Sequence, residues 1–260
     1  MLFQHYHNIF KRLLMLFLSI SSFSLLAQIV NIENLRQEKD SIGWSGHAQI
    51  QFSVQKNQNR ILELSNELRI QYKGKKSLWF FINDLNFKEI NGDDIVNNNL
   101  QHLRFSHTLS QKISFESFFQ SQADRISEIE LRILLGAGLR FNLYDSEKSK
   151  FFLGTTLMFE HENSTDELFG DIKNDIRNST YFSFKLKLNE NINIVSSNYY
   201  QPKLEDFSDF RILSETLLLF KVVKNLKFTT SFTYLFDAAP ATNVVEEQFK
   251  LSNGLVYFFD

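Results

Sequence analysis

The feature that most constrains the fold is an alternation of apolar and polar residues that runs from residue 43 almost to the end of the chain. In GWSGHAQIQFSVQ, residues 43–55, Trp44, Ile50 and Phe52 share one face and Gln51 lies on the other. Successive side chains of a β-strand point to opposite faces of a sheet, so this period of two predicts strands with one apolar and one polar face.

The segments that alternate in this way are long, and most of them have 11–17 residues. Strands of soluble proteins commonly have about 5–6 residues, whereas a tilted strand that crosses a bilayer needs about 9–11. The lengths favour a transmembrane, antiparallel, up-and-down β-barrel, and a secreted β-sandwich is the alternative. The twelve predicted strands are 43–56, 60–73, 76–89, 98–109, 112–124, 128–144, 150–162, 177–189, 191–201, 209–222, 225–237 and 247–259.

The links between the predicted strands indicate how such a barrel would be oriented. Barrels of the bacterial outer membrane have short periplasmic turns and longer outer loops. The long links here, INGDDIVNN, ENSTDELFGDIKND, PKLEDFS and AAPATNVVE, all follow odd-numbered strands, although two other odd links are short. We therefore expect both ends of the barrel segment on the periplasmic side, with the last strand paired to the first.

Aromatic residues make up 15% of the chain, and many of them fall near the ends of the predicted strands. Aromatic girdles at both membrane interfaces are typical of outer-membrane barrels. Leu, Ile, Val and further Phe residues are expected in the middle of the apolar face. The candidate girdle residues are Trp44, Tyr72, Trp79, Phe87, Phe141, Tyr200, Phe210, Phe220, Tyr234 and Phe236.

The N-terminal residues have the order of a secretory signal peptide, with a basic pair, an apolar stretch and a small-residue cleavage site. Lys11 and Arg12 precede LLMLFLSISSFSLLA, and cleavage is expected between Ala27 and Gln28. An uncleaved membrane anchor is the alternative. We expect a signal peptide at 1–27, a short periplasmic arm at 28–42, and an outer-membrane β-barrel at 43–260.

Composition excludes several classes of function. The formal net charge is −2, which predicts no nucleic-acid partner. The chain contains no cysteine, so disulfides, cysteine–zinc sites and thiol catalysis are excluded. No cofactor is expected.

Several stretches resemble a known bacterial family. GWSGHAQIQFSVQKNQNR, ELRIQY, SLWFFINDLNF and above all LRILLGAGLRFNLYD are similar to the salt-induced outer-membrane protein family, which carries a domain of unknown function. The resemblance covers residues 43–260 and implies a single-domain outer-membrane barrel without catalytic residues. The stretch LLAQ resembles the end of signal peptides in exported proteins of Bacteroidetes.

The polar face of the predicted barrel carries charges of both signs, which are expected to line the lumen. These residues form either a structural network of salt bridges or the wall of a narrow polar channel or ligand pocket, and the pattern alone leaves both readings open. The candidate residues are Glu63, Glu67, Arg69, Asp84, Arg104, Glu116, Glu130, Arg132, Arg140, Glu160, Glu162, Arg177, Lys185, Arg211 and Glu215.

Glycines lie on the same predicted face, at Gly136, Gly138, Gly154 and Gly254. Missing side chains there leave room for bulky partners such as Phe118 and Phe152, or for a ligand. Glycine also relieves bending strain in a curved sheet, and this is the commoner explanation.

The sequence offers candidates for two other kinds of site. A lipid hydrolase acting at the barrel rim needs a Ser–His pair, but His102 and Ser106 are separated by about 13 Å along one strand, and the alternation places His107 and His161 on the lipid side. The loop 164–175 offers four carboxylates for a hard cation, without the spacing of a known calcium loop: Asp166, Glu167, Asp171 and Asp175.

The chain ends in LVYFFD, in which Tyr257 and Phe259 share the apolar face. An aromatic residue near the C-terminus resembles the signal read by the barrel assembly machinery. We therefore expect a non-enzymatic outer-membrane protein, either a structural barrel or a narrow channel for small solutes. Its expected partners are outer-membrane lipids, lipopolysaccharide and the assembly machinery, and the oligomeric state stays open.

Overall fold

The computed structural model describes residues 42–56, 60–125, 127–164, 172–223, 226–241 and 244–257. The predicted signal peptide at 1–27 and almost all of the predicted arm lie outside these residues, so both stay predictions. Within the described part of the chain, no helix is long and apolar enough to cross a membrane.

The described residues form one antiparallel sheet of twelve strands in the order of the sequence, β1 to β12. The predicted all-β, up-and-down architecture is therefore confirmed. The strands are β1 (Gly43–Lys56), β2 (Arg60–Lys73), β3 (Ser77–Ile90), β4 (Asp93–Thr108), β5 (Ile113–Asp124), β6 (Ile129–Asp145), β7 (Ser149–Ser164), β8 (Ile172–Lys187), β9 (Ile192–Pro202), β10 (Phe210–Val223), β11 (Leu226–Asp237) and β12 (Glu247–Tyr257).

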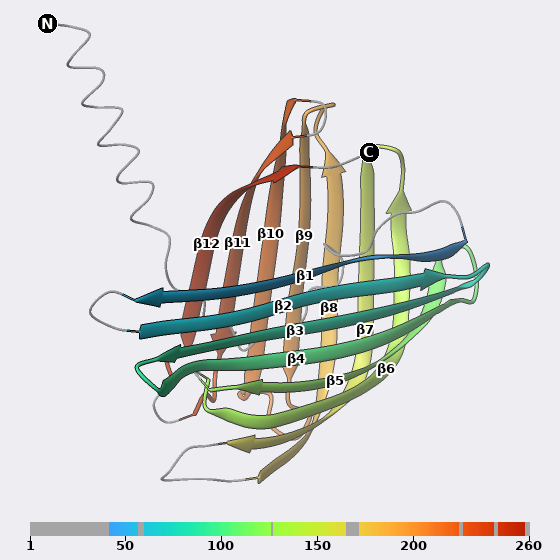
Figure 1. Cartoon of the computed structure of the whole chain (residues 1–260). Coiled ribbons are helices and arrows are strands. Elements are labelled where there is room, and N and C mark those ends of the chain that lie inside the picture. Colours follow the sequence, from blue (N-terminus) through green and yellow to red (C-terminus); the bar gives the residue numbers. More distant parts are fainter. Residues whose placement is uncertain are drawn as a thin grey trace, which may run out of the picture.

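The sheet rolls up into a barrel, so that β1–β4 pass across β8–β11 in Figure 1. Contacts across the interior agree with this shape: Arg211 on β10 reaches Glu160 on β7, and Tyr181 on β8 reaches Glu116 on β5. Every ladder joins neighbours in the sequence, and among the described residues no ladder joins β12 to β1. The expected closing pair is therefore not seen in this part of the chain.

The strand bounds follow the prediction closely except in two places. Strand β4 begins at Asp93, five residues before its predicted start, because the expected loop INGDDIVNN is a two-residue turn. Its central residues, Asn91 and Gly92, have φ of 56° and 97°. Positive φ at both positions is typical of a type I′ hairpin turn, which Asn-Gly favours. Strand β8 begins at Ile172 rather than at 177.

Because the number of antiparallel strands is even, the first strand begins and the last strand finishes at the same end of the barrel. We call the end where β1 begins and β12 finishes the terminal end, and the opposite one the loop end. The three longest links, at 165–171, 203–209 and 238–246, are all at the loop end. The predicted parity of long links is thus kept by these three, whereas the β3–β4 link departs from it.

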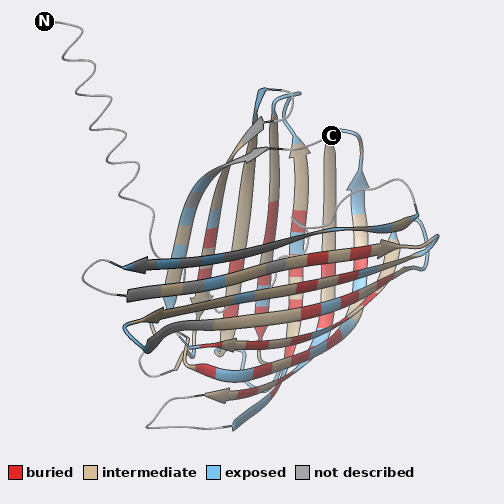
Figure 2. Ribbon diagram, in the orientation of Figure 1, coloured by how far each residue is buried: buried red, intermediate tan, exposed pale blue. Residues whose placement is uncertain are grey.

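The burial of side chains is inverted relative to a soluble domain. Glu160 and Arg177 on the inward face are each 1% exposed, whereas Leu135 and Leu157 on the outward face are 57% and 59% exposed. Buried residues alternate along the strands, as the red bands in Figure 2 show. The polar face is therefore the interior, as the alternation predicts, and the apolar face points outward.

Outward-facing rings contact one another near both ends of the barrel. At the terminal end, Trp44 packs on Tyr72 with ring centroids 4.9 Å apart, and Trp79 packs on Phe105 at 4.5 Å. At the loop end, Phe210 lies between Tyr200 and Phe236. This arrangement has the form of the two aromatic girdles of a membrane barrel.

The outward face is less uniformly apolar than expected, because small polar residues interrupt it on β9 and β10. The Ser214 hydroxyl donates to Asn198 Oδ1 at 2.7 Å, and the Asn198 amide donates to Ser196 Oγ at 3.3 Å. Ser196 in turn bonds Thr216 at 2.9 Å. These groups satisfy one another, which lowers the cost of placing them on an otherwise apolar surface.

Candidate functional site: the charged interior

The densest group of charges surrounds Glu160 on β7. Its carboxylate contacts Arg132 from β6 at 3.2 Å, Arg177 from β8 at 2.7 Å and Arg211 from β10 at 2.5 Å. All four side chains are buried on the inward face. Burying an unpaired charge is costly, so the three guanidinium groups depend on this carboxylate and its neighbours.

Further acids complete the set of charges around these arginines. Glu162 contacts Arg132 at 2.5 Å and Arg211 at 3.4 Å, and Asp237 at the end of β11 contacts Arg211 at 2.8 Å. We use the name Glu160 cluster for Arg132, Glu160, Glu162, Asp175, Arg177, Lys203, Asp209, Arg211 and Asp237.

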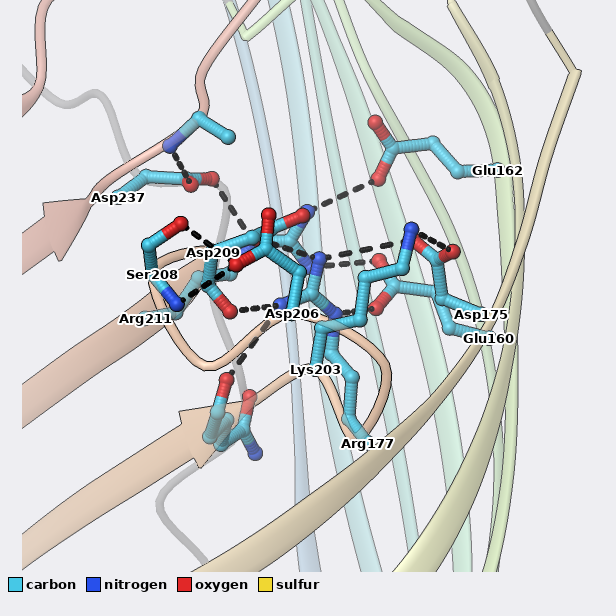
Figure 3. Close-up of polar contacts among 12 residues, drawn as sticks. Glu160, Glu162, Asp175, Arg177, Lys203, Asp206, Ser208, Asp209, Arg211 and Asp237 are labelled. Carbon is cyan, nitrogen blue, oxygen red and sulfur yellow. Dashed lines mark hydrogen bonds and ion pairs between the residues drawn. The ribbon is translucent and has the colours of Figure 1, made fainter.

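The link 203–209 folds back onto this cluster instead of extending from the barrel (Figure 3). Arg177 contacts the Asp209 carboxylate at 2.9 Å and donates to the Asp209 carbonyl at 3.3 Å. Lys203 contacts Asp175 at 2.7 Å. The hydrogen bond to the Asp175 carboxylate raises the pKa of Lys203. Arg177 thus holds the link against the interior. The Glu160 cluster extends over the inward faces of β6 to β11 at the loop end.

A second group of charges lies toward the terminal end, around Glu116 on β5. Its carboxylate contacts Arg104 at 3.1 Å and Arg140 at 3.9 Å, and it accepts a hydrogen bond of 2.8 Å from the Tyr181 hydroxyl. Arg104 also lies 4.9 Å from the centre of the Phe118 ring. We name Arg104, Glu116, Arg140 and Tyr181 the Glu116 cluster.

Apolar and aromatic residues lie between the two clusters on β5–β11, beside a chain of buried polar side chains that runs from Arg104 through His102 and Gln120 to Gln122. Phe118, Leu134 and Met158 pack together, and a second group joins Tyr181 and Tyr199 to Leu213 and Leu235. All of these residues are buried. The interior of this wall is therefore stacked as charge, a largely apolar layer and charge.

The glycines of β6 and β7 make room for the rings of this layer. A Cβ at Gly136 would run into the Phe118 ring, and one at Gly154 would run into the Tyr181 ring. At Gly138 the obstacle is instead the backbone of β7, at Thr155 and Thr156. Gly136 and Gly154 therefore leave space for a bulky partner, which is one of the two predicted uses of these glycines. Phe118 is one of the partners that the sequence predicts. Phe152, the other expected partner, lies under Arg140, 3.9 Å from the guanidinium carbon.

The remaining predicted lumen residues are dispersed. Arg69 and Asp84 form a separate pair at 2.6 Å, and Asp84 is 41% exposed. Lys185 and Glu215 are half-buried on the inward faces of β8 and β10. The side chains of Glu63 and Glu67 lie outside the described ones, so their roles stay predictions.

Glu130 is not part of the charged interior, which corrects its predicted place. The ladder between β6 and β7 shifts register between Ile129 and Leu131, so that Ile129 is buried and Glu130 is exposed. Its carboxylate accepts a hydrogen bond of 2.7 Å from Asn163. A bulge adds one residue to a strand and reverses the alternation on one side of it.

Four members of the Glu160 cluster were not among the predicted lumen residues. Asp175 falls in the predicted metal loop, because the sequence predicts a start of β8 at 177; in the structure it shares the inward face with Arg177. Asp237 lies opposite Arg211 in the ladder, so the alternation of β11 could have identified it. Lys203 and Asp209 lie in a link, where no sequence period applies.

Three histidines have side chains that the structure describes, and each has identified contacts. His102 bonds Gln120 through Nδ1 at 3.0 Å and accepts from Arg104 at Nε2 at 3.4 Å. His161 bonds Asn174, and His107 stacks on Phe105. None of the three bonds a serine hydroxyl, so these histidines provide no nucleophile–base pair.

The two other candidate sites lie largely outside the described residues. Asp166, Glu167 and Asp171 of the acidic loop belong to 165–171, which the structure does not describe. Tyr257 ends β12 opposite Leu226, but its side chain and all of Phe259 are likewise not described. The metal loop and the assembly signal therefore stay untested predictions.

Comparison with protein families matches residues 47–259 to the profile described as "Protein of unknown function, DUF481". That description carries neither the salt-induced name nor a Bacteroidetes source, so these two points stay predictions. No curated protein matches the chain.

Among solved structures, the chain is similar to the NanC porin, with a TM-score of 0.49, 10% identity, and coverage of 76% of this chain and 94% of that one. It is also similar to the KdgM porin, with a TM-score of 0.42, 12% identity, and coverage of 82% of this chain and 100% of that one. A third similar structure is the translocator domain of autotransporter NalP from Neisseria meningitidis, with a TM-score of 0.42, 8% identity, and coverage of 87% of this chain and 91% of that one. No functional assignment follows from likeness at this level.

Proposed function

The chain belongs to the DUF481 family of proteins of unknown function, and from its geometry we propose that it is a non-enzymatic outer-membrane β-barrel with a structural role. The observation that carries the proposal is the inverted burial: charged residues fill the inside and large apolar residues cover the outside. A large, mostly apolar outer surface of this kind is typical of contact with a membrane. Closed barrels are the sheets that can span lipid.

Within this proposal, the structural reading of the charges is favoured over the channel reading. The acids and arginines of the two clusters neutralise each other directly, and the apolar layer lies between them. A wide diffusion pore would need water along its wall instead. Outer-membrane lipids and lipopolysaccharide would be the partners of the outward face, and a cleaved segment at 1–27 would direct export.

Membrane fractionation and planar bilayers together test this proposal. We expect the expressed protein to fractionate with the outer membrane and to migrate faster on a gel when unheated, as a folded barrel does. Reconstituted in planar bilayers, it should give no stepwise conductance. A protein that is soluble and monomeric without detergent would contradict the membrane assignment. Discrete conductance steps from the pure protein would contradict the structural role and favour a narrow channel.

A further inference from the structure

The two ends of the barrel carry opposite charge. At the terminal end, the described links 74–76, 109–112, 146–148 and 188–191 contain four lysines and two glutamates. At the loop end, the described parts of the links contain two basic residues, Arg125 and Lys203, and five acids. Neither the Glu160 cluster nor the Glu116 cluster explains the excess of lysine at the terminal end.

One of these link lysines, Lys148, lines a cavity at the terminal end, near the β6–β7 and β8–β9 links, where lysines of the adjoining strands join it. The cavity has a volume of 300 Å³, and its lining includes Lys148, Lys150, Lys185 and Lys187, together with the single acid Glu147. Val195 and Leu219 supply apolar wall. A pocket that holds a small ligand has about 300–1,000 Å³, so the size suits a small solute.

The register of the sheet places two of these lysines against each other. Lys150 on β7 lies directly opposite Lys185 on β8. Lys187 follows two residues later, about 7 Å along the same face of the strand. Like charges directly opposite in a ladder are destabilising. Lys150 also contacts Asp145 at 3.5 Å, which offsets part of this repulsion, but the lining as a whole stays strongly basic.

We propose that this lysine-lined cavity is a binding site for a small, multiply charged anion of the phosphate class. Lysine ammonium groups bind phosphate as point charges, and several of them around one cavity favour a ligand with more than one negative charge. Either a soluble phosphate ester or a phospholipid headgroup could supply that chemistry. The proposal goes beyond the structural role and does not depend on whether the barrel conducts.

Calorimetric titration of the detergent-refolded full chain with pyrophosphate tests the site. The wild-type protein should bind pyrophosphate, and the double variant Lys150→Gln/Lys185→Gln should bind at least tenfold more weakly. The matched control is Lys75→Gln/Lys76→Gln, which removes the same charge from two exposed lysines of the β2–β3 link at the same end. This control should change the affinity less than twofold.

Three further readouts make the outcome decisive. Heat-modifiable migration of each variant shows that it is folded, so that lost binding is not lost structure. Absence of binding to the wild type, or equal weakening in both double variants, would overturn the proposal. In neutral lipid nanodiscs, competition by added cardiolipin, which carries two phosphates, that depends on Lys150 and Lys185 would identify a headgroup as the source, and pyrophosphate binding unaffected by that lipid would identify a soluble anion. A barrel that folds without detergent would contradict the proposed function alone.

Discussion

Glu160 and Glu116 are both buried on the inward face of the same wall, but they are neutralised in different ways. Glu160 is shared by three arginines from three strands, and four further carboxylates contact those arginines. They belong to Glu162, Asp175, Asp209 and Asp237. Glu116 contacts two arginines and a neutral tyrosine hydroxyl. Each arginine of the Glu116 cluster also lies over an aromatic ring. At the loop end, the arginines are therefore neutralised by carboxylates alone. At the terminal end, a carboxylate and aromatic rings share that role.

The largest expected effect follows from removing the shared charge at the loop end. Glu160→Gln keeps the shape of the side chain but leaves three buried guanidinium groups with one acceptor charge fewer. Breaking a buried ion pair costs about 3–5 kcal/mol of unfolding free energy. Urea denaturation of the refolded barrel in detergent measures this loss.

The control for this variant is Glu130→Gln on the neighbouring strand. Glu130 is exposed and only accepts a hydrogen bond from Asn163, so its replacement should cost less than about 1 kcal/mol. Equal losses for the two glutamates would show that the Glu160 cluster does not stabilise the barrel.

A smaller loss is expected from Glu116→Gln. Tyr181 still finds an acceptor in the amide oxygen, and Arg104 and Arg140 keep their contacts with Phe118 and Phe152. The loss should be about 1.5–3 kcal/mol, the usual range for hydrogen bonds to a charged group. The same denaturation experiment compares the two variants, and a loss greater than that of Glu160→Gln would reverse the contrast drawn above.

The smallest effect is expected outside both clusters, at the pair of Arg69 and Asp84. Asp84 is 41% exposed, so solvent screens the pair. Asp84→Asn should lower the unfolding free energy by about 0.2–1 kcal/mol, as measured for exposed ion pairs. A loss comparable with that of Glu116→Gln would mean that Asp84 belongs to a third buried cluster.

Much of the fold could be predicted because one period dominates the sequence. The bounds of β1 and β2 agree with the prediction, since their alternation is continuous over both strands. The start of β4 was wrong because Asn and Asp residues after Gly92 were interpreted as loop, although Asn91-Gly92 is itself a hairpin signal. Polar residues inside the barrel are as compatible with a strand as with a loop, so composition alone cannot separate the two.

The charged interior could be predicted in part, for a related reason. Alternation identifies which residues point inward, and it brings Arg132, Glu160 and Arg211 to one interior. It does not reveal bulges, so Glu130 was misplaced, and it does not extend into links, so Asp209 was missed. Which inward residues meet across the barrel depends on how far the sheet rolls, and no local pattern in the sequence encodes that.

The way in which the sheet is connected also has a consequence for the order of folding. In the part of the chain that the structure describes, all ladders join strands that are adjacent in the sequence, so each can form as a hairpin with little loop-closure cost. The contact between Arg211 and Glu160 spans 51 residues and exists only once β7 and β10 face each other. We therefore expect it to form late, after the rate-limiting step of barrel formation. Weakening a late contact mainly speeds unfolding and leaves the folding rate almost unchanged. The Glu160 cluster is thus expected to slow unfolding and so to determine the lifetime of the folded barrel.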